Sequence, residues 1–175
     1  MMKKFLILFL LVISGCVAQR EPIQLKSIFN AEQAKKQLEK GNMTLTGEAF
    51  LRQRRGTVVT CAGQGVSLIP ETEYASERMM HIYGSPYQGY RPAIDATYSS
   101  ITFIPEEPSY HTYTKNTVCD AQGHFKFTNL KKGKYIIIAT VVWETADGNY
   151  TSTQGGLLME QINLTEDSQH VLITR

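Results

Sequence analysis

The run KYIIIATVVW, Lys134–Trp143, constrains the fold more than any other part of the sequence. Alternate side chains of a strand point to opposite faces of its sheet, and here both faces are apolar. One face carries Tyr135, Ile137, Ala139 and Val141, and the other carries Ile136, Ile138 and Val142. A strand that is apolar on both faces is central in its sheet and covered on both sides. We therefore expect a second layer beneath this sheet and a further segment of chain over its outer face.

The segment before this strand predicts a strand of a different kind. In HFKFTNL, His124–Leu130, Phe125 and Phe127 face inward and polar residues lie between them. Turn signals flank it, with Asp120 to Gly123 before it and Lys131 to Gly133 after it. One apolar face and one polar face are typical of an antiparallel sheet packed on a core.

Together these segments resemble the transthyretin-like sandwich of carboxypeptidase regulatory-like domains, in which the pattern D-x-x-G-x-F-x-F-x-x-L-x-x-G-x-Y recurs. The matching residues are Asp120, Gly123, Phe125, Phe127, Leu130, Gly133 and Tyr135. The resemblance implies an antiparallel Greek-key β-sandwich of about seven strands in two sheets. The insert at residues 71–109 departs from the short connection of that family. Short strands separated by turn signals predict the same mainly β class without the resemblance.

We expect the sandwich to occupy residues 42–175, preceded by a short helix at residues 30–41. Asn30 is an N-cap type residue, Gln33 follows three positions later, and Gly41 is a stop signal. The short apolar runs TVVTC and VSLIP flank the turn AGQG, and this pattern predicts a β-hairpin.

The N-terminal sequence MMKKFLILFLLVISGC has the three-part plan of a secretory signal. Lys3 and Lys4 precede an apolar run that is too short for a permanent membrane-spanning helix. The ending Ile13-Ser14-Gly15-Cys16 resembles the bacterial lipobox.

The lipobox resemblance implies that residues 1–15 are removed and that Cys16 carries acyl chains such as palmitate. Several acyl chains anchor a protein stably in a membrane. Residues 16–29 would form the tether from membrane to domain. Val17 follows the cysteine where Asp would favour the inner membrane, so we expect the outer membrane of a bacterial envelope, facing the periplasm.

The mature chain would be formally neutral. The signal contains two lysines and no acid, so the 18 Lys and Arg residues fall to 16, equal to the 16 Asp and Glu residues. Nucleic acid is therefore not an expected partner, because no basic excess remains to meet its phosphates.

Cys61 and Cys119 remain once Cys16 is lipidated, and an even pair in an oxidising compartment predicts a disulfide. Two separate buried thiols are the alternative, which spacing alone does not exclude. Neither cysteine belongs to a CxxC or Cys/His cluster, so we expect no metal there.

Tyrosines gather in the insert at residues 71–109 and just after it. The insert opens with helical spacing in Glu71–Gly84 and continues into stretches rich in Tyr, Pro and Gly. Long loops are usually functional or disordered, and tyrosine suits a surface that is both apolar and polar. The candidate ligand surface consists of Tyr83, Tyr87, Tyr90, Tyr98 and Tyr110. The alternative is that these rings form a lid over the outer face of the sandwich.

Catalytic motifs such as GxSxG, HExxH and the phosphate-binding loop do not occur in the sequence. The one constellation with hydrolase or metal chemistry is His111 with His124 and Asp120, and it requires their strands to pair. Three-ligand metal spacing is missing, so we expect no metal, no cofactor and no catalytic residue.

We expect a membrane-anchored envelope lipoprotein whose non-catalytic β-sandwich binds or scaffolds another envelope component, either a protein or a glycan. In the glycan alternative, Tyr87, Tyr90 and Tyr98 are the stacking platforms. A metal-dependent envelope hydrolase is the remaining alternative.

Overall fold

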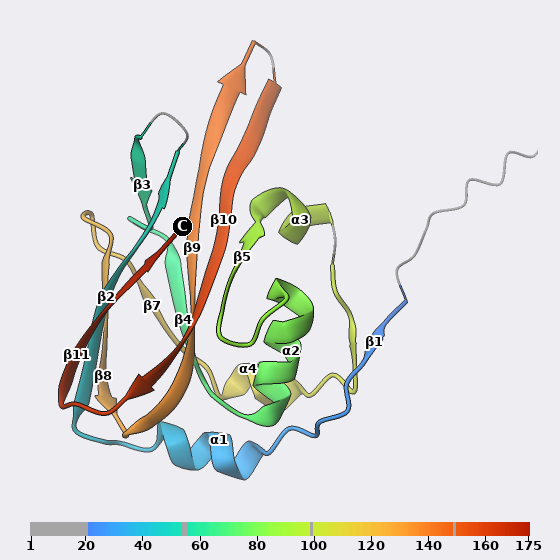
Figure 1. The fold of residues 1–175 in the computed structure, drawn as a ribbon, viewed down its shortest axis with the longest axis vertical. Coiled ribbons are helices and arrows are strands. Elements are labelled where there is room, and N and C mark those ends of the chain that lie inside the picture. Colours follow the sequence, from blue (N-terminus) through green and yellow to red (C-terminus); the bar gives the residue numbers. More distant parts are fainter. Residues whose placement is uncertain (1–20, 54–55, 99, 149) are drawn as a thin grey trace, which may run out of the picture.

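Two β-sheets packed face to face form the body of the protein in the computed structural model, which describes residues 21–53, 56–98, 100–148 and 150–175 (Figure 1). The larger sheet has five strands in the order β5-β10-β9-β4-β7. They are β5 (Gln88–Pro92), β10 (Tyr150–Leu164), β9 (Gly133–Asp147), β4 (Gly65–Pro70) and β7 (Lys115–Val118). The four-stranded sheet has β2 at its centre, with β11 on one side and β3 and β8 on the other. They are β2 (Met43–Arg52), β3 (Val58–Thr60), β8 (His124–Leu130) and β11 (Ser168–Thr174).

Strand β9 is the central strand that its sequence predicts. It pairs antiparallel with β4 on one side and β10 on the other. Ile137 faces the core between the two sheets and Ile136 faces the opposite side, and both are 0% exposed. The predictions of a mainly β sandwich and of a strand buried on both faces are confirmed.

The chain crosses between the two sheets where a hairpin was expected. Strand β3 pairs with β2, whereas β4 pairs with β7 and β9, so the predicted hairpin of these two segments is wrong. The crossing brings the end of β3 beside the end of β7. Cys61 and Cys119 form a disulfide there, with their Cα atoms 5.7 Å apart and both residues buried. The bridge therefore links the edges of the two sheets.

Strands β2 and β11 pair in parallel, which corrects the expectation of purely antiparallel sheets. Gly47 lies at the centre of β2 and permits this packing. A Cβ atom at Gly47 would lie 2.5 Å from the ring of Phe125 on β8 and 2.7 Å from the carbonyl oxygen of Val171 on β11. Val171 and Phe125 can approach the β2 backbone because this position has no side chain.

The insert covers the outer face of the five-stranded sheet. It contains α2 (Glu73–Tyr83), α3 (Ala93–Tyr98), β6 (Phe103–Ile104) and α4 (Pro108–Thr112), and its strand β5 joins the sheet as an edge strand beside β10. Helix α2 begins at the N-cap Thr72 and ends at the left-handed Gly84. A second core of buried residues lies beneath these elements: Leu25, Ile69, Tyr74, Ala75, Met79, Phe103, Tyr110, Ile136 and Met159. We call this set the outer core, and the set between the two sheets the inner core.

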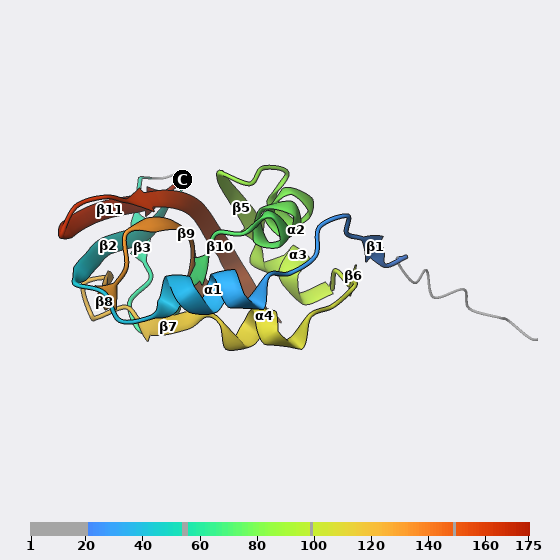
Figure 2. The same ribbon diagram turned by 90° about the horizontal axis from the view of Figure 1, so that it is seen from below.

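Helix α1 (Ala31–Leu38) lies across one end of the sandwich rather than over the outer face (Figure 2). The Asn30 side chain accepts a hydrogen bond from the amide of Gln33, as the capping pattern predicts. Strand β1 (Ile23–Gln24) pairs with β6, and Leu25 is buried in the outer core, so this part of the expected tether packs on the insert. Cys16 and the expected signal lie outside the described residues.

Candidate functional site

The five tyrosines of the expected ligand surface do not share one surface. Tyr110 is only 4% exposed and lies in the outer core, apart from the exposed surface that carries Tyr87. Tyr83 is half-buried, and burial raises the pKa of its hydroxyl far above the usual range. Tyr87 is 67% exposed. Tyr110 differs because the apolar outer face of β9 needs a cover, and the aromatic rings of the insert supply it.

Tyr90 lines a groove on the inner-core side of the five-stranded sheet, and Tyr110 lines a cleft on the other side. The side chain of Tyr98 lies outside the part of the chain that the structure describes. The groove lies at the edge of the sandwich, where β5 and β10 of one sheet face the end of β11 from the other. Its volume is about 300 Å³. We call it the Tyr90 groove, and it is lined by Gln88, Gly89, Tyr90, Leu158, Met159, Glu160, Ile173, Thr174 and Arg175.

Two interactions fix the ring of Tyr90. Its hydroxyl donates a hydrogen bond to the carbonyl oxygen of Gly155 at 2.8 Å. The guanidinium carbon of Arg175 lies 4.6 Å from the ring centroid, a cation–π distance. Burial raises the pKa of the Tyr90 hydroxyl despite the opposing charge of Arg175, so the hydroxyl stays protonated at neutral pH.

The glycines of β10 make room for this ring. A Cβ atom at Gly156 would lie 2.9 Å from Cε2 of Tyr90. The Gly155-Gly156 pair in the sequence was the available signal that a side chain approaches this strand closely, and it was not used in the prediction.

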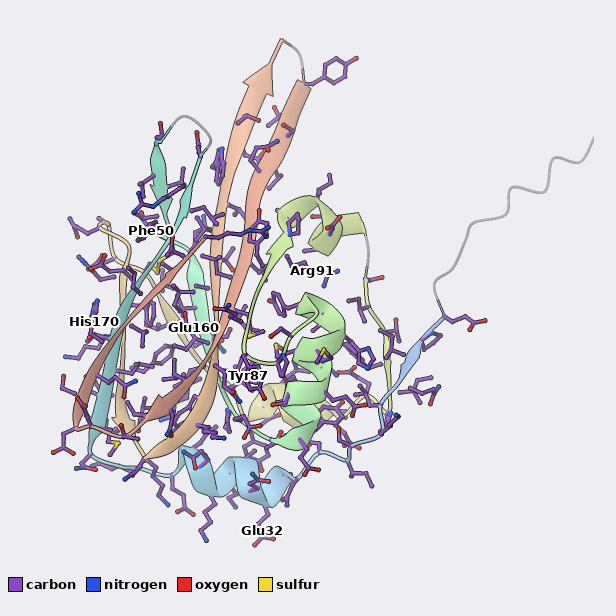
Figure 3. The ribbon with its side chains drawn as sticks, in the orientation of Figure 1. Glu32, Phe50, Tyr87, Arg91, Glu160 and His170 are labelled. Carbon is purple, nitrogen blue, oxygen red and sulfur yellow. A yellow bond between two sulfur atoms is a disulfide. The ribbon has the colours of Figure 1, made fainter. Side chains whose placement is uncertain are left out.

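Glu160 places a carboxylate in the same groove. It lies directly opposite Gln88 in the β10–β5 register, so the two side chains share a face of the sheet. Burial raises the pKa of Glu160 above its usual value. Figure 3 shows Glu160 on the lower half of β10, with β11 on one side and β5 on the other. The groove thus combines a carboxylate, an amide, a guanidinium and an aromatic ring.

A second cluster of polar side chains lies on the outer face of the four-stranded sheet, in a shallow cleft of about 580 Å³. His124 contacts Asp120 at 3.1 Å through Nδ1 and Glu48 at 3.4 Å through Nε2. His170 lies 3.9 Å from the same Glu48 carboxylate. Hydrogen bonds from the backbone amides of His124 and Gln122 lower the pKa of Asp120 and hold the turn before β8. This arrangement is an exposed group of polar contacts across three strands, in which His124 and Asp120 form a hydrogen bond.

The expected hydrolase constellation is not assembled. His124 and Asp120 do meet, but His111 lies on α4 and contacts Glu106 at 3.2 Å. Their elements do not pair, because β8 belongs to the four-stranded sheet and α4 lies on the far side of the other sheet. Across the described ranges, no group of three or more His, Cys, Asp or Glu side chains is arranged to hold a metal ion.

None of the helices in the described residues has the length and apolar character needed to cross a membrane.

No protein-family model matches the chain, and no curated protein matches it in sequence. A search of solved structures found a crystal structure from Pseudomonas aeruginosa, described there as a "putative carbohydrate binding protein", with a TM-score of 0.68. The superposition covers 84% of this chain and 97% of that chain, at 22% sequence identity. This chain is therefore similar in fold to that protein over most of its length.

Proposed function

We propose that this protein is a lipid-anchored, non-catalytic carbohydrate-binding protein of the bacterial envelope and that the Tyr90 groove holds one sugar unit. The observation that carries the proposal is the placement of an aromatic ring, a half-buried carboxylate and an amide around one groove. Small-molecule sites combine apolar walls with a few placed polar groups in the same way. We further propose that the sandwich has the Greek-key order of the transthyretin-like family.

The chemistry of a sugar matches these groups. A pyranose has an apolar C–H face and hydroxyls around its rim, and tyrosine offers a flat apolar face. Glu160 can accept two hydroxyl hydrogen bonds, and Gln88 can both accept and donate. The sugar ring would take the place of Arg175 over Tyr90, and the displaced guanidinium could then donate to a hydroxyl. The carbohydrate-binding description of the structural neighbour supports the same class of ligand.

The anchoring part of the proposal rests on the lipobox resemblance at Cys16. An anchored module with a sugar-binding groove would hold the membrane close to an envelope glycan. Growth with labelled palmitate tests this part alone, because the Cys16→Ser variant should lose both the label and membrane association. Unlabelled wild-type protein would overturn the anchoring and leave the groove untouched.

A glycan array that includes peptidoglycan fragments, followed by calorimetry on the strongest hit, tests the binding part. We expect Tyr90→Ala to weaken binding about tenfold through loss of stacking, and Tyr90→Phe to retain most of it. Glu160→Gln should weaken binding severalfold, because it removes a charged acceptor. The matched control is Tyr150→Ala, since Tyr150 is 82% exposed at the β9–β10 turn. Failure of every glycan to bind, or equal binding by the Tyr90→Ala variant, would overturn the proposal.

A further inference from the structure

A further cleft, separate from the Tyr90 groove and from the cleft at His124, lies between the insert and the outer face of the five-stranded sheet. Its volume is about 420 Å³. Helices α2 and α4 form one wall, and the outward side chains of β4, β9 and β10 form the floor. We call it the Arg78 cleft. The floor carries the apolar side chains of Ile69, Ile138 and Leu157, and at one side the hydrogen-bonded pair of Ser67 and Asn116.

Two buried polar atoms without a hydrogen-bond partner belong to residues of this cleft. Among the described residues, only Nε of Arg78 and the hydroxyl of Tyr110 are buried side-chain atoms that lack a partner. Arg78 is 7% exposed and Tyr110 is 4% exposed. Burying a polar group without a partner costs about 1–3 kcal/mol, so folded proteins rarely leave two of them together.

One nitrogen of the Arg78 guanidinium, Nη1, already has two hydrogen-bond partners. Its Nη1 donates to Glu106 at 2.8 Å and to the hydroxyl of Tyr74 at 3.1 Å. The rings of Phe103 and Tyr110 lie 4.2 Å and 4.7 Å from its guanidinium carbon. The charge of Arg78 is therefore already balanced by Glu106, while a donor on the same group remains unused.

The two unpaired atoms are both donors. The Nε–H of arginine can only donate. Burial raises the pKa of the Tyr110 hydroxyl to about 12, so that it keeps its proton at neutral pH. A group that completes the Arg78 side of this site must therefore accept a hydrogen bond, and the Tyr110 hydroxyl can donate to the same group.

We propose that the Arg78 cleft binds a small, mostly apolar molecule through a neutral oxygen acceptor, such as the carbonyl oxygen of a ketone, an amide or an ester. The oxygen accepts from Tyr110 and Arg78, and the apolar part lies on Ile138 and Leu157. A carboxylate is disfavoured, because it would place a second anion beside Glu106, which already balances the charge of Arg78. This ligand and its site are independent of sugar binding in the Tyr90 groove.

Three probes of nearly the same shape separate the contributions of the acceptor and its charge: acetophenone, ethylbenzene and benzoate. Their dissociation constants can be measured by titration of the ¹⁵N-labelled protein in NMR spectra. We expect acetophenone to bind at least fivefold more tightly than either of the other two. The amide signals that shift should belong to the floor and to α4, including Ile138 and Leu157.

Two variants assign the binding to the cleft. Tyr110→Phe should abolish the preference for acetophenone over ethylbenzene, and Leu157→Trp should block all three probes by filling the floor. The matched control is Tyr150→Phe, which removes the same hydroxyl from an exposed ring and should leave all three affinities unchanged.

Several results would overturn the proposal. Equal affinity for acetophenone and ethylbenzene would show that the unpaired donors do not bind the carbonyl oxygen. Tightest binding of benzoate would show that the site takes an anion. No binding of any probe would indicate that an ordered water molecule satisfies the two donors and that the cleft is part of the hydrated core.

Discussion

The inner core and the outer core share the same central strand but are built differently. Among the residues that the structure describes, the inner core has no buried charged residue, and the Cys61–Cys119 disulfide links its two sheets. The outer core closes around Arg78, whose guanidinium lies among the rings of Tyr74, Phe103 and Tyr110. Both unpaired buried polar atoms of the described residues lie on the outer side.

This difference separates the part of the molecule that specifies the fold from a part with unused binding capacity. The inner core is complete in its own packing, since alternating apolar residues from two sheets fill it. The outer core leaves hydrogen-bond donors without acceptors. Natural proteins retain such donors where a bound water molecule or another bound group supplies the acceptor. Substitutions on the two sides of the same sheet should therefore have different consequences.

The largest expected effect concerns the covalent link of the inner core. Cys61 and Cys119 are 58 positions apart, and the chain-entropy model assigns about 4 kcal/mol to a loop of that size. The double variant Cys61→Ala, Cys119→Ala should lose about this much free energy of unfolding in urea titrations. Wild-type protein treated with a reductant should lose a similar amount. A loss below about 1 kcal/mol would mean that packing alone holds the two sheet edges together.

The next prediction compares the stability cost of substitutions on the two faces of β9. Ile137→Ala opens a cavity in the inner core and Ile136→Ala opens one in the outer core, and each should cost about 3 kcal/mol. Ile138→Ala, at a half-buried position on the outer face, should cost less than either. Urea unfolding of the three variants measures this. A cost for Ile136→Ala well below that for Ile137→Ala would show that the insert covers the sheet only loosely.

Much of the inner side was predictable from the sequence because its signals are local. Apolar residues on both faces of β9 predicted a strand that is buried on both sides. Asn30 and Gln33 predicted the start of α1. Pairing partners were not predictable in this way. The hairpin of β3 and β4 was wrong, because two short apolar strands around a glycine turn can also separate into different sheets. Register and partner choice depend on contacts between distant segments.

The candidate sites were predictable only in part for the same reason. Tyr90 was named from the sequence, but Glu160 joins it only through the pairing of β10 with β5. Arg78 follows Tyr74 by one turn of α2, so both side chains lie on the same face of the helix. This spacing was the available signal for a buried arginine beside a tyrosine. That signal was not decisive, because a charged residue on a helix is usually solvated, and Glu106 lies 28 positions further along the chain.

The third effect concerns the charge at the centre of the outer core. Arg78→Met keeps the apolar stem but leaves Glu106 without its main partner, and should cost about 2 kcal/mol at neutral pH. Lys131→Met removes a surface pair with Glu39 and is the matched control, and it should cost much less because solvent screens that pair. Equal losses in the two variants would mean that the Arg78 pair behaves as an ordinary surface contact.

The same pair predicts a dependence on pH. Burial alone would raise the pKa of Glu106, but the hydrogen bonds and charges of Arg78 and, to a smaller extent, His111 together outweigh burial and lower it. A carboxyl whose pKa is lowered in the folded state stabilises the protein above its unfolded pKa, near 4.5, and this contribution is lost as the pH falls through the folded pKa. The difference in stability between wild-type protein and Arg78→Met should therefore shrink below about pH 4.5. A difference that stays constant down to pH 3 would contradict the role given to Glu106.

The smallest effect is expected for two tyrosines of the outer core, Tyr74 and Tyr110, whose ring centroids lie 5.4 Å apart. The Tyr74 hydroxyl donates to the carbonyl oxygen of Pro105 and accepts from Arg78, so Tyr74→Phe should cost about 1 kcal/mol. The Tyr110 hydroxyl has no partner, so Tyr110→Phe should leave the free energy of unfolding unchanged or raise it by up to about 1 kcal/mol. Thermal and urea unfolding of the two variants without ligand measures the difference. A loss of stability in Tyr110→Phe equal to that in Tyr74→Phe would mean that the Tyr110 hydroxyl is already satisfied in the free protein, and the donor proposed for the Arg78 cleft would not be available to a ligand.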